Sequence, residues 1–265
     1  MSDFIGTKLT MNLGERSYDI ILKNGALENL YQFARLDRKV AVVTDSGVPA
    51  QYAQRVADQC RDAVIITVPQ GEASKSFKIL ETVLKQMLDF HMGRGDLVVA
   101  VGGGVVGDLA GFAASIYMRG IDFINCPTTT LSMIDSSIGG KTAVDLGDTK
   151  NIVGAFWQPK LVIVDPDTLA TLPRRHYING LAEAVKASLL ADPELFAIFE
   201  KGDIDGQINE IIYRSLRFKK NIVEQDETEH GMRKALNFGH TIGHGIEAVK
   251  GIKGRRTVGL FHGEC

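Results

Sequence analysis

Two histidines four residues apart near the end of the chain are the pair best suited to metal chemistry. The segment Asn237-Phe-Gly-His-Thr-Ile-Gly-His244 contains both, and His262 follows in His-Gly-Glu. Residues four apart on a helix share one face, so His240 and His244 could converge on one point. Neutral imidazole is the commonest protein ligand for zinc, and an open three-ligand site suits metal-assisted catalysis. Half-buried, hydrogen-bonded helix histidines give the same spacing, so the pair alone leaves both interpretations open.

A glycine-rich segment follows a short apolar run in the middle of the chain. Residues 96–101 lead into Gly102-Gly-Gly-Val-Val-Gly-Asp108, and a helix-like run, 109–114, comes next. Gly102, Gly104 and Gly107 satisfy the spacing G-x-G-x-x-G at a strand-to-helix turn, where backbone N–H groups and a helix N-terminus can hold a pyrophosphate. A tight turn that needs glycine for its backbone conformation gives the same pattern. The segment therefore indicates either a dinucleotide site or a structural turn.

Further candidates for cofactor contact stand at the ends of other apolar runs. Glu72 and Lys75 lie in the polar turn after residues 63–68, and Asp45 follows residues 39–44. Thr128 and Thr129 follow residues 122–126. Open α/β sheets bind ligands at the carboxyl ends of their strands, where Asp45 could hydrogen-bond a ribose diol. Each of these residues is equally an ordinary cap or loop residue.

Lysines and amides beside glycines are candidates for binding an anionic substrate. The segments 135–141 and 150–151 have this character, and Arg119 is a further candidate. Glu183 and Lys186 stand three apart on a predicted helix. They form either an ordinary surface ion pair or part of a site to which Glu183 gives a metal-binding carboxylate. Four more candidates precede the histidines: Lys219, Glu229, Arg233 and Asn237.

The elements that must position these residues change in character along the chain. Apolar runs at 39–44, 63–68, 96–101, 122–126 and 161–165 alternate with helical patterns such as 49–59 and 76–90. Near-continuous apolar strands separated by helices predict a parallel sheet covered on both faces. Two earlier strands, 8–13 and 18–22, are expected to pair through a turn near Gly14. After residue 172 only helices are expected, at 180–191 and 208–224. The predicted organisation is an α/β domain, residues 1–172, and an all-helical domain, residues 173–265.

Composition limits the class of protein. A net charge of -2 over 265 residues provides no charge excess that would favour nucleic acid or an anionic membrane. The three cysteines lack the spacing of a disulfide framework or a thiolate zinc site. The first residues lack the pattern of a signal peptide, and no apolar stretch approaches the ~20 residues of a membrane span. We therefore expect a cytoplasmic protein that binds small molecules.

Motifs in the same order along the chain resemble one known family. Gly71-Glu72 with Lys75, Gly102 to Gly111, Asp135 to Lys141, Asn237 to His244 and His262 to Glu264 carry much of the resemblance. The chain is similar in these segments to 3-dehydroquinate synthase, within the sugar phosphate cyclase group. Other matching segments are Gly14 to Tyr18, Pro127 to Thr129, Lys150-Asn151, Gly154 to Phe156, Leu172-Pro173 and Gly180 to Glu183.

The resemblance implies a Rossmann-like domain that binds NAD and an all-helical metal-binding domain. It makes Glu183, His240 and His262 the ligands of a zinc or cobalt ion, with His244 facing the substrate instead. It assigns catalysis to Lys141, Glu229, Asn237 and His244. The implied substrate contacts are Arg119, Asp135, Lys141, Asn151, Lys186, Lys219, Arg233, Asn237 and His244. The implied NAD contacts are Asp45, Glu72, Lys75, Gly103, Gly104, Asp108, Thr128, Thr129, Lys141, Lys150 and Thr171. The family is typically dimeric, and Arg119 is expected to reach a neighbouring subunit's site.

The implied reaction uses one bound NAD without consuming it. NAD oxidises a secondary alcohol of 3-deoxy-D-arabino-heptulosonate 7-phosphate while the metal polarises the oxygens involved. The ketone acidifies the adjacent C–H so that phosphate is eliminated, NADH returns the hydride, and the opened ring closes by an intramolecular aldol addition. The product is 3-dehydroquinate, in the second step of the shikimate pathway. A cluster of cations suits a substrate that carries both carboxylate and phosphate.

The chain is expected to be shorter than other members of the family that it resembles. Family members continue beyond the position of Cys265 with several helices, one of which gives a substrate-binding lysine. Residues 250–259 also form a longer link than usual. We therefore expect a stably folded N-terminal half, but weak substrate binding and low turnover. The alternatives are a cyclase that makes a cyclitol from a neutral sugar phosphate, a metal-dependent polyol dehydrogenase that releases NADH, and an inactive paralogue that acts as a binding module.

Overall fold

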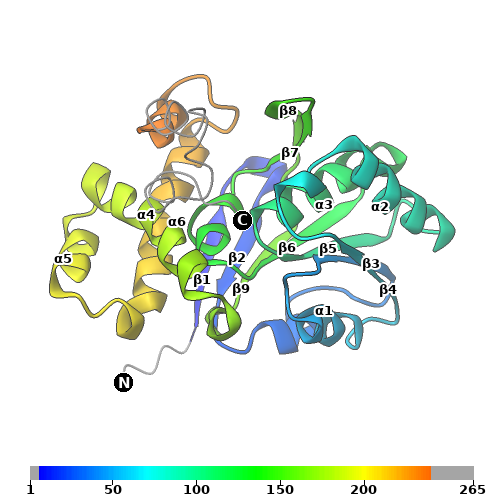
Figure 1. Cartoon of the computed structure of the whole chain (residues 1–265), viewed down its shortest axis with the longest axis horizontal. Coiled ribbons are helices and arrows are strands. Elements are labelled where there is room, and N and C mark those ends of the chain that lie inside the picture. Colours follow the sequence, from blue (N-terminus) through cyan, green and yellow to red (C-terminus); the bar gives the residue numbers. More distant parts are fainter. Residues whose placement is uncertain (1–5, 240–265) are drawn as a thin grey trace.

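One mixed sheet organises the computed structural model, which describes residues 6–239. Its strand order is β1-β2-β9-β6-β5-β3-β4 (Figure 1). β1 and β2 pair antiparallel and the other neighbours pair parallel, as the apolar runs predict. The strands are β1 (Thr7–Met11), β2 (Tyr18–Leu22), β3 (Lys39–Asp45), β4 (Asp62–Val68), β5 (Leu97–Gly102), β6 (Asp122–Pro127) and β9 (Leu161–Val164).

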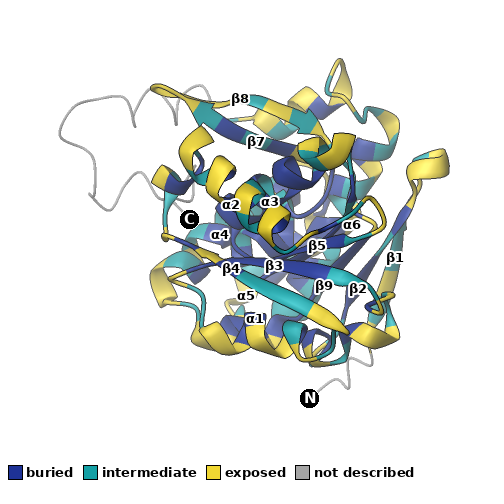
Figure 2. Cartoon of the chain, turned by 90° about the vertical axis from the view of Figure 1, so that its right-hand side faces the viewer, coloured by how far each residue is buried: buried dark blue, intermediate teal, exposed yellow. Residues whose placement is uncertain are grey.

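Helices cover both faces of the parallel part of the sheet. Helix α1 (Ala50–Ala57) and the short turn Leu27–Gln32 pack on one face, around Val40, Val42 and Val99. Helices α2 (Phe77–Asp89) and α3 (Gly104–Ile116) pack on the other, around Val43 and Val98. The central strands β3 and β5 are consequently buried along most of their length (Figure 2). Burial on both faces accounts for their unbroken apolar sequence.

A helical layer packs beside β1, β2 and β9. It contains α4 (Arg174–Ala191), α5 (Pro193–Lys201) and α6 (Ile208–Gln225). A continuous apolar core joins these helices to the sheet through Ile20, Val162 and Leu216. The predicted fold class, a Rossmann-like sheet followed by helices, is thus confirmed. The proposed boundary at residue 172 stays a prediction.

Two helical features differ from the sequence expectation. Helix α4 begins six residues before the predicted position, at Arg174, directly after Pro173. Helix α5 was not expected, although Asp192 caps it by accepting from Leu195 N at 3.0 Å and Pro193 occupies its first turn. Both signals are typical of a helix start. No helix within residues 6–239 is long and apolar enough to cross a membrane.

A separate two-stranded hairpin projects from the sheet domain at the top of Figure 1. It consists of β7 (Lys141–Leu146) and β8 (Thr149–Phe156), paired antiparallel. This hairpin was not predicted, although Gly147-Asp148 between two β-prone runs is a hairpin signal. Other short helical turns are Gly14–Arg16, Glu72–Ser74, Tyr117–Arg119, Ser132–Ser136, Pro166–Thr171, Asp205–Gln207 and Met232–Asn237.

Candidate active site

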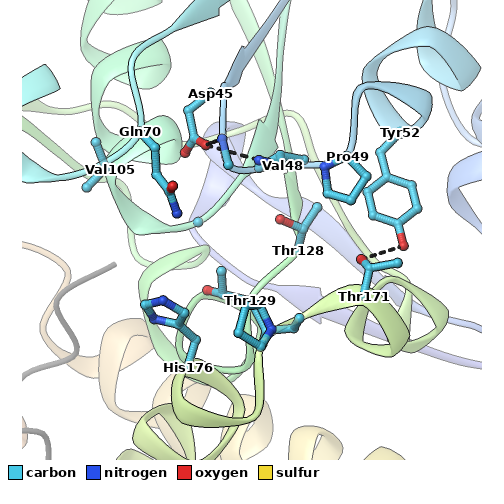
Figure 3. Close-up of a pocket in the computed structure, with 14 residues that line it drawn as sticks. Asp45, Val48, Pro49, Tyr52, Gln70, Val105, Thr128, Thr129, Thr171 and His176 are labelled. Carbon is cyan, nitrogen blue, oxygen red and sulfur yellow. Dashed lines mark hydrogen bonds between the residues drawn. The ribbon is translucent and has the colours of Figure 1, made fainter.

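A first pocket, here called the cofactor pocket, opens at the carboxyl ends of β3, β5 and β6 (Figure 3). Asp45 in this pocket accepts hydrogen bonds from Gly47 N at 2.7 Å and Val48 N at 3.2 Å. Burial raises the pKa of Asp45, although these two bonds act in the opposite direction. Five of the predicted cofactor residues line the pocket together: Asp45, Gly103, Thr128, Thr129 and Thr171.

The glycine turn supplies the floor of the cofactor pocket. Gly103 caps α3, which begins at Gly104, so the unpaired N–H groups of the helix start lie beside the pocket. A Cβ atom at Gly102 would stand 2.6 Å from Val106 Cγ2, and one at Gly104 would stand 3.1 Å from Ser136 Oγ. The turn therefore needs glycine for close packing and also offers backbone donors to an anion.

Three further side chains of the cofactor pocket were not predicted from the sequence. Gln70 follows β4 at the same sheet edge, in the turn from which only Glu72 and Lys75 were selected. Tyr52 reaches the pocket from α1, and its hydroxyl lies 2.9 Å from Thr171 Oγ1. His176 belongs to the first turn of α4, which was predicted to begin later. The Pro173 signal for that helix start could have identified His176.

A second pocket, here called the substrate pocket, lies on the hairpin side of α3. It contains about 1240 Å³ of empty space, part of it open to solvent. Residues from α3, both hairpin strands, α6 and the segment after α6 converge here. Seven of the predicted site residues line it: Asp108, Asp135, Lys141, Asn151, Lys219, Glu229 and Asn237.

Lys219 and Asp135 form a buried ion pair in the substrate pocket. Lys219 Nζ lies 2.8 Å from Asp135 Oδ1 and donates to the Asp135 carbonyl at 2.6 Å. Burial lowers the pKa of Lys219, and the charge of Asp135 only partly offsets this effect. Burial would raise the pKa of Asp135, but the charge and hydrogen bond of Lys219 outweigh it and the pKa falls. Both residues of this pair line the substrate pocket.

Glu229 joins the hairpin to the segment after α6. Its carboxylate pairs with Lys141 Nζ and accepts from Asn237 Nδ2 at 3.0 Å. The backbone of Glu229 has φ 63°, in the left-handed region that non-glycine residues seldom adopt. Burial opposes ionisation of this carboxyl group, but the Lys141 and Asn237 hydrogen bonds outweigh it and lower its pKa. Three residues to which the resemblance assigns catalysis are thus in direct contact.

Lys75 lies beside the substrate pocket, where it contacts two of the residues that line it. Its ammonium is 2.6 Å from Asp108 Oδ2 and also donates to the Asn151 side-chain oxygen. The Lys75 side chain is only 5% exposed, so this lysine holds α3 and the hairpin together from within. Glu72 and Lys150, the remaining predicted cofactor residues of this region, face each other at 4.0 Å.

Glu183 is the one predicted metal ligand within the described residues. It pairs with Lys186, whose ammonium also donates to the Leu236 carbonyl at 2.7 Å. Burial and the nearby negative charge of Asp135 raise the pKa of Glu183. The other predicted ligands, His240 and His262, and the predicted catalytic residue His244 lie outside the described residues. The metal assignment therefore stays a prediction.

Three predicted substrate contacts do not line the substrate pocket in this structure: Lys186, described above, Arg233 and Arg119. Arg233 is 1% exposed and donates to the carbonyls of Glu227 and Gly139, the latter at 3.0 Å. Arg119 lies between the end of α3 and the start of β6. Arg119 therefore stands at the amino-terminal ends of the parallel strands, whereas the cofactor pocket opens at their carboxyl ends. Its predicted role at a neighbouring subunit's site stays a prediction.

Comparison with known families decides the identity. Residues 65–179 match the family model described as 3-dehydroquinate synthase N-terminal, and residues 180–265 match 3-dehydroquinate synthase C-terminal. The chain belongs to the 3-dehydroquinate synthase family. It is 44% identical to the 3-dehydroquinate synthase of Streptococcus thermophilus, over 97% of this chain and 75% of the relative. It is 41% identical to that of Pelobacter propionicus, over 97% and 74%. These matches make the chain a cyclase of the 3-dehydroquinate synthase type.

Solved structures of related cyclases share the fold. A 2-deoxy-scyllo-inosose synthase complexed with carbaglucose-6-phosphate, NAD+ and Co2+ superposes with a TM-score of 0.85 at 27% identity, covering 96% of this chain and 73% of the other. The 2-epi-5-epi-valiolone synthase from Streptomyces hygroscopicus, with NAD+ and Zn2+ bound, gives 0.78 at 30% identity, covering 88% and 68%. A probable glycerol dehydrogenase from Sinorhizobium meliloti, 16% identical with a TM-score of 0.62 over 91% and 72%, shares the fold alone.

Proposed function

We propose that this chain converts 3-deoxy-D-arabino-heptulosonate 7-phosphate to 3-dehydroquinate and phosphate, with NAD and a zinc or cobalt ion as cofactors. The observation that supports this reaction is the adjacency of the two pockets along α3. The start of α3 faces the cofactor pocket, and Asp108 on the same helix lines the substrate pocket. Residues that would hold a dinucleotide and residues that would hold the substrate thus lie along one helix.

The chain's own groups suit both cofactors. Asp45, Thr128, Thr129, Thr171 and the glycine turn provide a ribose acceptor, hydroxyls and backbone donors for NAD. Glu183 offers a partly buried carboxylate, and its combination with the imidazoles of His240 and His262 is a common zinc ligand set. When bound, NAD supplies reversible oxidation of an alcohol and the metal supplies Lewis-acid polarisation of substrate oxygens.

The residues of the substrate pocket bind and orient an anionic sugar. Lys141 and Lys219 supply positive charge for the phosphate and the carboxylate, and Asn151 and Asn237 supply amide donors. Each lysine is paired with an acid in this structure, so substrate anions must compete with Asp135 and Glu229. Glu229, held by Lys141 and Asn237, is positioned to take part in proton transfer at the reacting carbons.

A homodimer in the cytoplasm is part of the same proposal. Arg119 is exposed at the amino-terminal ends of the parallel strands, where a second subunit could use it. Phosphate release from the seven-carbon substrate without accumulation of NADH is the signature of this reaction. A polyol dehydrogenase of the same fold would instead accumulate NADH.

Replacing Gly104 tests the cofactor arrangement. In Gly104→Val, a branched side chain would meet Ser136 and obstruct the backbone donors at the start of α3. We expect NAD affinity to fall by at least about tenfold, which corresponds to about 1.4 kcal/mol. Calorimetric titration with NAD measures the effect. Gly95→Val, at the opposite end of β5 where an added Cβ meets no atom within 4 Å, is the matched control. Equal affinity in wild type and Gly104→Val would make the turn purely structural.

A further inference from the structure

Asp145 lies opposite a bulge in the β7–β8 hairpin. The ladder pairs Val144 with Val153 and Leu146 with Thr149. Between these pairs, residue 145 alone faces residues 150–152, so β8 carries the extra residues. Bulges beside active sites redirect side chains away from the regular alternation of a strand. Here the bulge contains Asn151, which lines the substrate pocket.

Asp145 fixes this bulge with its carboxylate and anchors it with its backbone. Asp145 Oδ1 accepts from Asn151 N at 2.7 Å, and Asp145 N donates to the Lys75 carbonyl at 2.8 Å. Asn151 has φ 56°, a left-handed conformation that asparagine adopts more readily than most residues but less readily than glycine. The hydrogen bond from its amide stabilises this conformation and holds Asn151 in place.

A contact with Lys75 determines which atom of the Asn151 side-chain amide can bind a substrate. Its Oδ1 accepts from Lys75 Nζ, the ammonium that also pairs with Asp108. Because a side-chain amide has one oxygen and one NH2 group, the remaining Nδ2 is the group that can donate to a substrate oxygen. An Asn151 backbone released from the bulge would lose both the Lys75 contact and this orientation.

We propose that Asp145 is a positioning residue for the substrate, acting through Asn151 so that the amide donates to an anionic oxygen of a phosphorylated sugar acid. The inference rests on the proposed function for the identity of that substrate. The contact between Asp145 and Asn151 stands independently of it. Asp145 joins the segment that carries Lys75 to the hairpin that forms one wall of the substrate pocket.

Two substitutions separate positioning from a general structural role. Asp145→Ala removes the acceptor, and we expect KM for the seven-carbon substrate to rise about tenfold, the effect of one lost hydrogen bond. The kcat value should change less than threefold, and NAD affinity should remain unchanged. Asp145→Asn keeps an acceptor oxygen and should restore KM to near the wild-type value. Asp148→Ala, an exposed acidic position in the turn of the same hairpin, is the matched control.

The backbone amide of Asn151 gives a readout that is independent of turnover. In asparagine-labelled protein, its NMR signal should move and lose protection from hydrogen exchange in Asp145→Ala but not in Asp145→Asn. An unchanged amide in Asp145→Ala, or an unchanged KM once the amide is released, would overturn the proposal. A parallel loss of thermal stability, NAD affinity and substrate affinity in both variants would also overturn it. If the wild type releases no phosphate, the proposed function fails, and the amide comparison still decides the contact.

Discussion

Lys219→Met should abolish most of the activity while leaving a folded protein. Methionine approximates the length of lysine but removes the ammonium that pairs with Asp135. Loss of one partner of a buried charge pair costs about 2–5 kcal/mol. We therefore expect kcat/KM for phosphate release to fall roughly 1,000-fold, corresponding to about 4 kcal/mol. The free energy of unfolding should also fall, by about 3 kcal/mol, because the Asp135 carboxylate is left without its main partner.

The neighbouring lysine provides the control. Lys220 pairs with Glu224 one turn further along α6 and does not line the substrate pocket. Lys220→Met should keep kcat/KM within about threefold of wild type, because Lys220 is not among the residues that line the substrate pocket. Near-normal kcat/KM in Lys219→Met would remove Lys219 from the site. Equal losses in both variants would indicate a defect of α6 as a whole.

Arg233→Lys should lower stability before any ligand is added. The buried guanidinium donates to two carbonyls, those of Gly139 and Glu227, and lies 5.8 Å from the Phe156 ring. A lysine ammonium lacks the planar fork that spans two acceptors. An unsatisfied buried acceptor costs about 1–3 kcal/mol, so we expect Tm to fall by about 5 °C. KM should rise as well, because Gly139 and Glu227 hold the segments that carry Lys141 and Glu229.

Differential scanning calorimetry of the ligand-free protein distinguishes this role from direct substrate contact. Arg217→Lys, at a half-exposed position on α6, should leave Tm within about 1 °C of wild type. A substrate-binding Arg233 with no structural role would give an unchanged Tm and a raised KM. That combination would support the substrate contact predicted from the family resemblance and would argue against the structural role.

The sheet could be predicted because each strand has a characteristic local sequence. A strand buried on both faces needs an unbroken apolar run, whereas an amphipathic helix of the same length needs apolar residues on one face only. Each run also ends in a residue that breaks the strand. The β7–β8 hairpin escaped because most of β8 is exposed and carries Thr149, Lys150 and Asn151 in place of a clear alternation. Helix α5 was not predicted because a single residue, Asp192, separates it from α4, so the signal that starts α5 coincides with the end of α4.

The sequence predicted many residues of the candidate site but not the contacts between them. The edge rule for parallel sheets brings together Asp45, Gly103 and Thr128, which follow three different strands. The pairing of Lys141 with Glu229 joins residues far apart in the sequence, and no local pattern specifies it. The burial of Arg233 could not be predicted either, because an arginine after a helix is normally exposed to solvent.

Phosphate release from the seven-carbon sugar acid phosphate tests most directly whether this chain catalyses the proposed reaction. The protein would be loaded with NAD and zinc or cobalt, and phosphate and NADH would be followed together. Parallel reactions would contain glucose 6-phosphate, or chelator in place of the metal. We expect phosphate release from the seven-carbon substrate alone, dependent on metal, with no NADH accumulating. Phosphate release from glucose 6-phosphate in preference, or stoichiometric NADH, would contradict the proposed reaction.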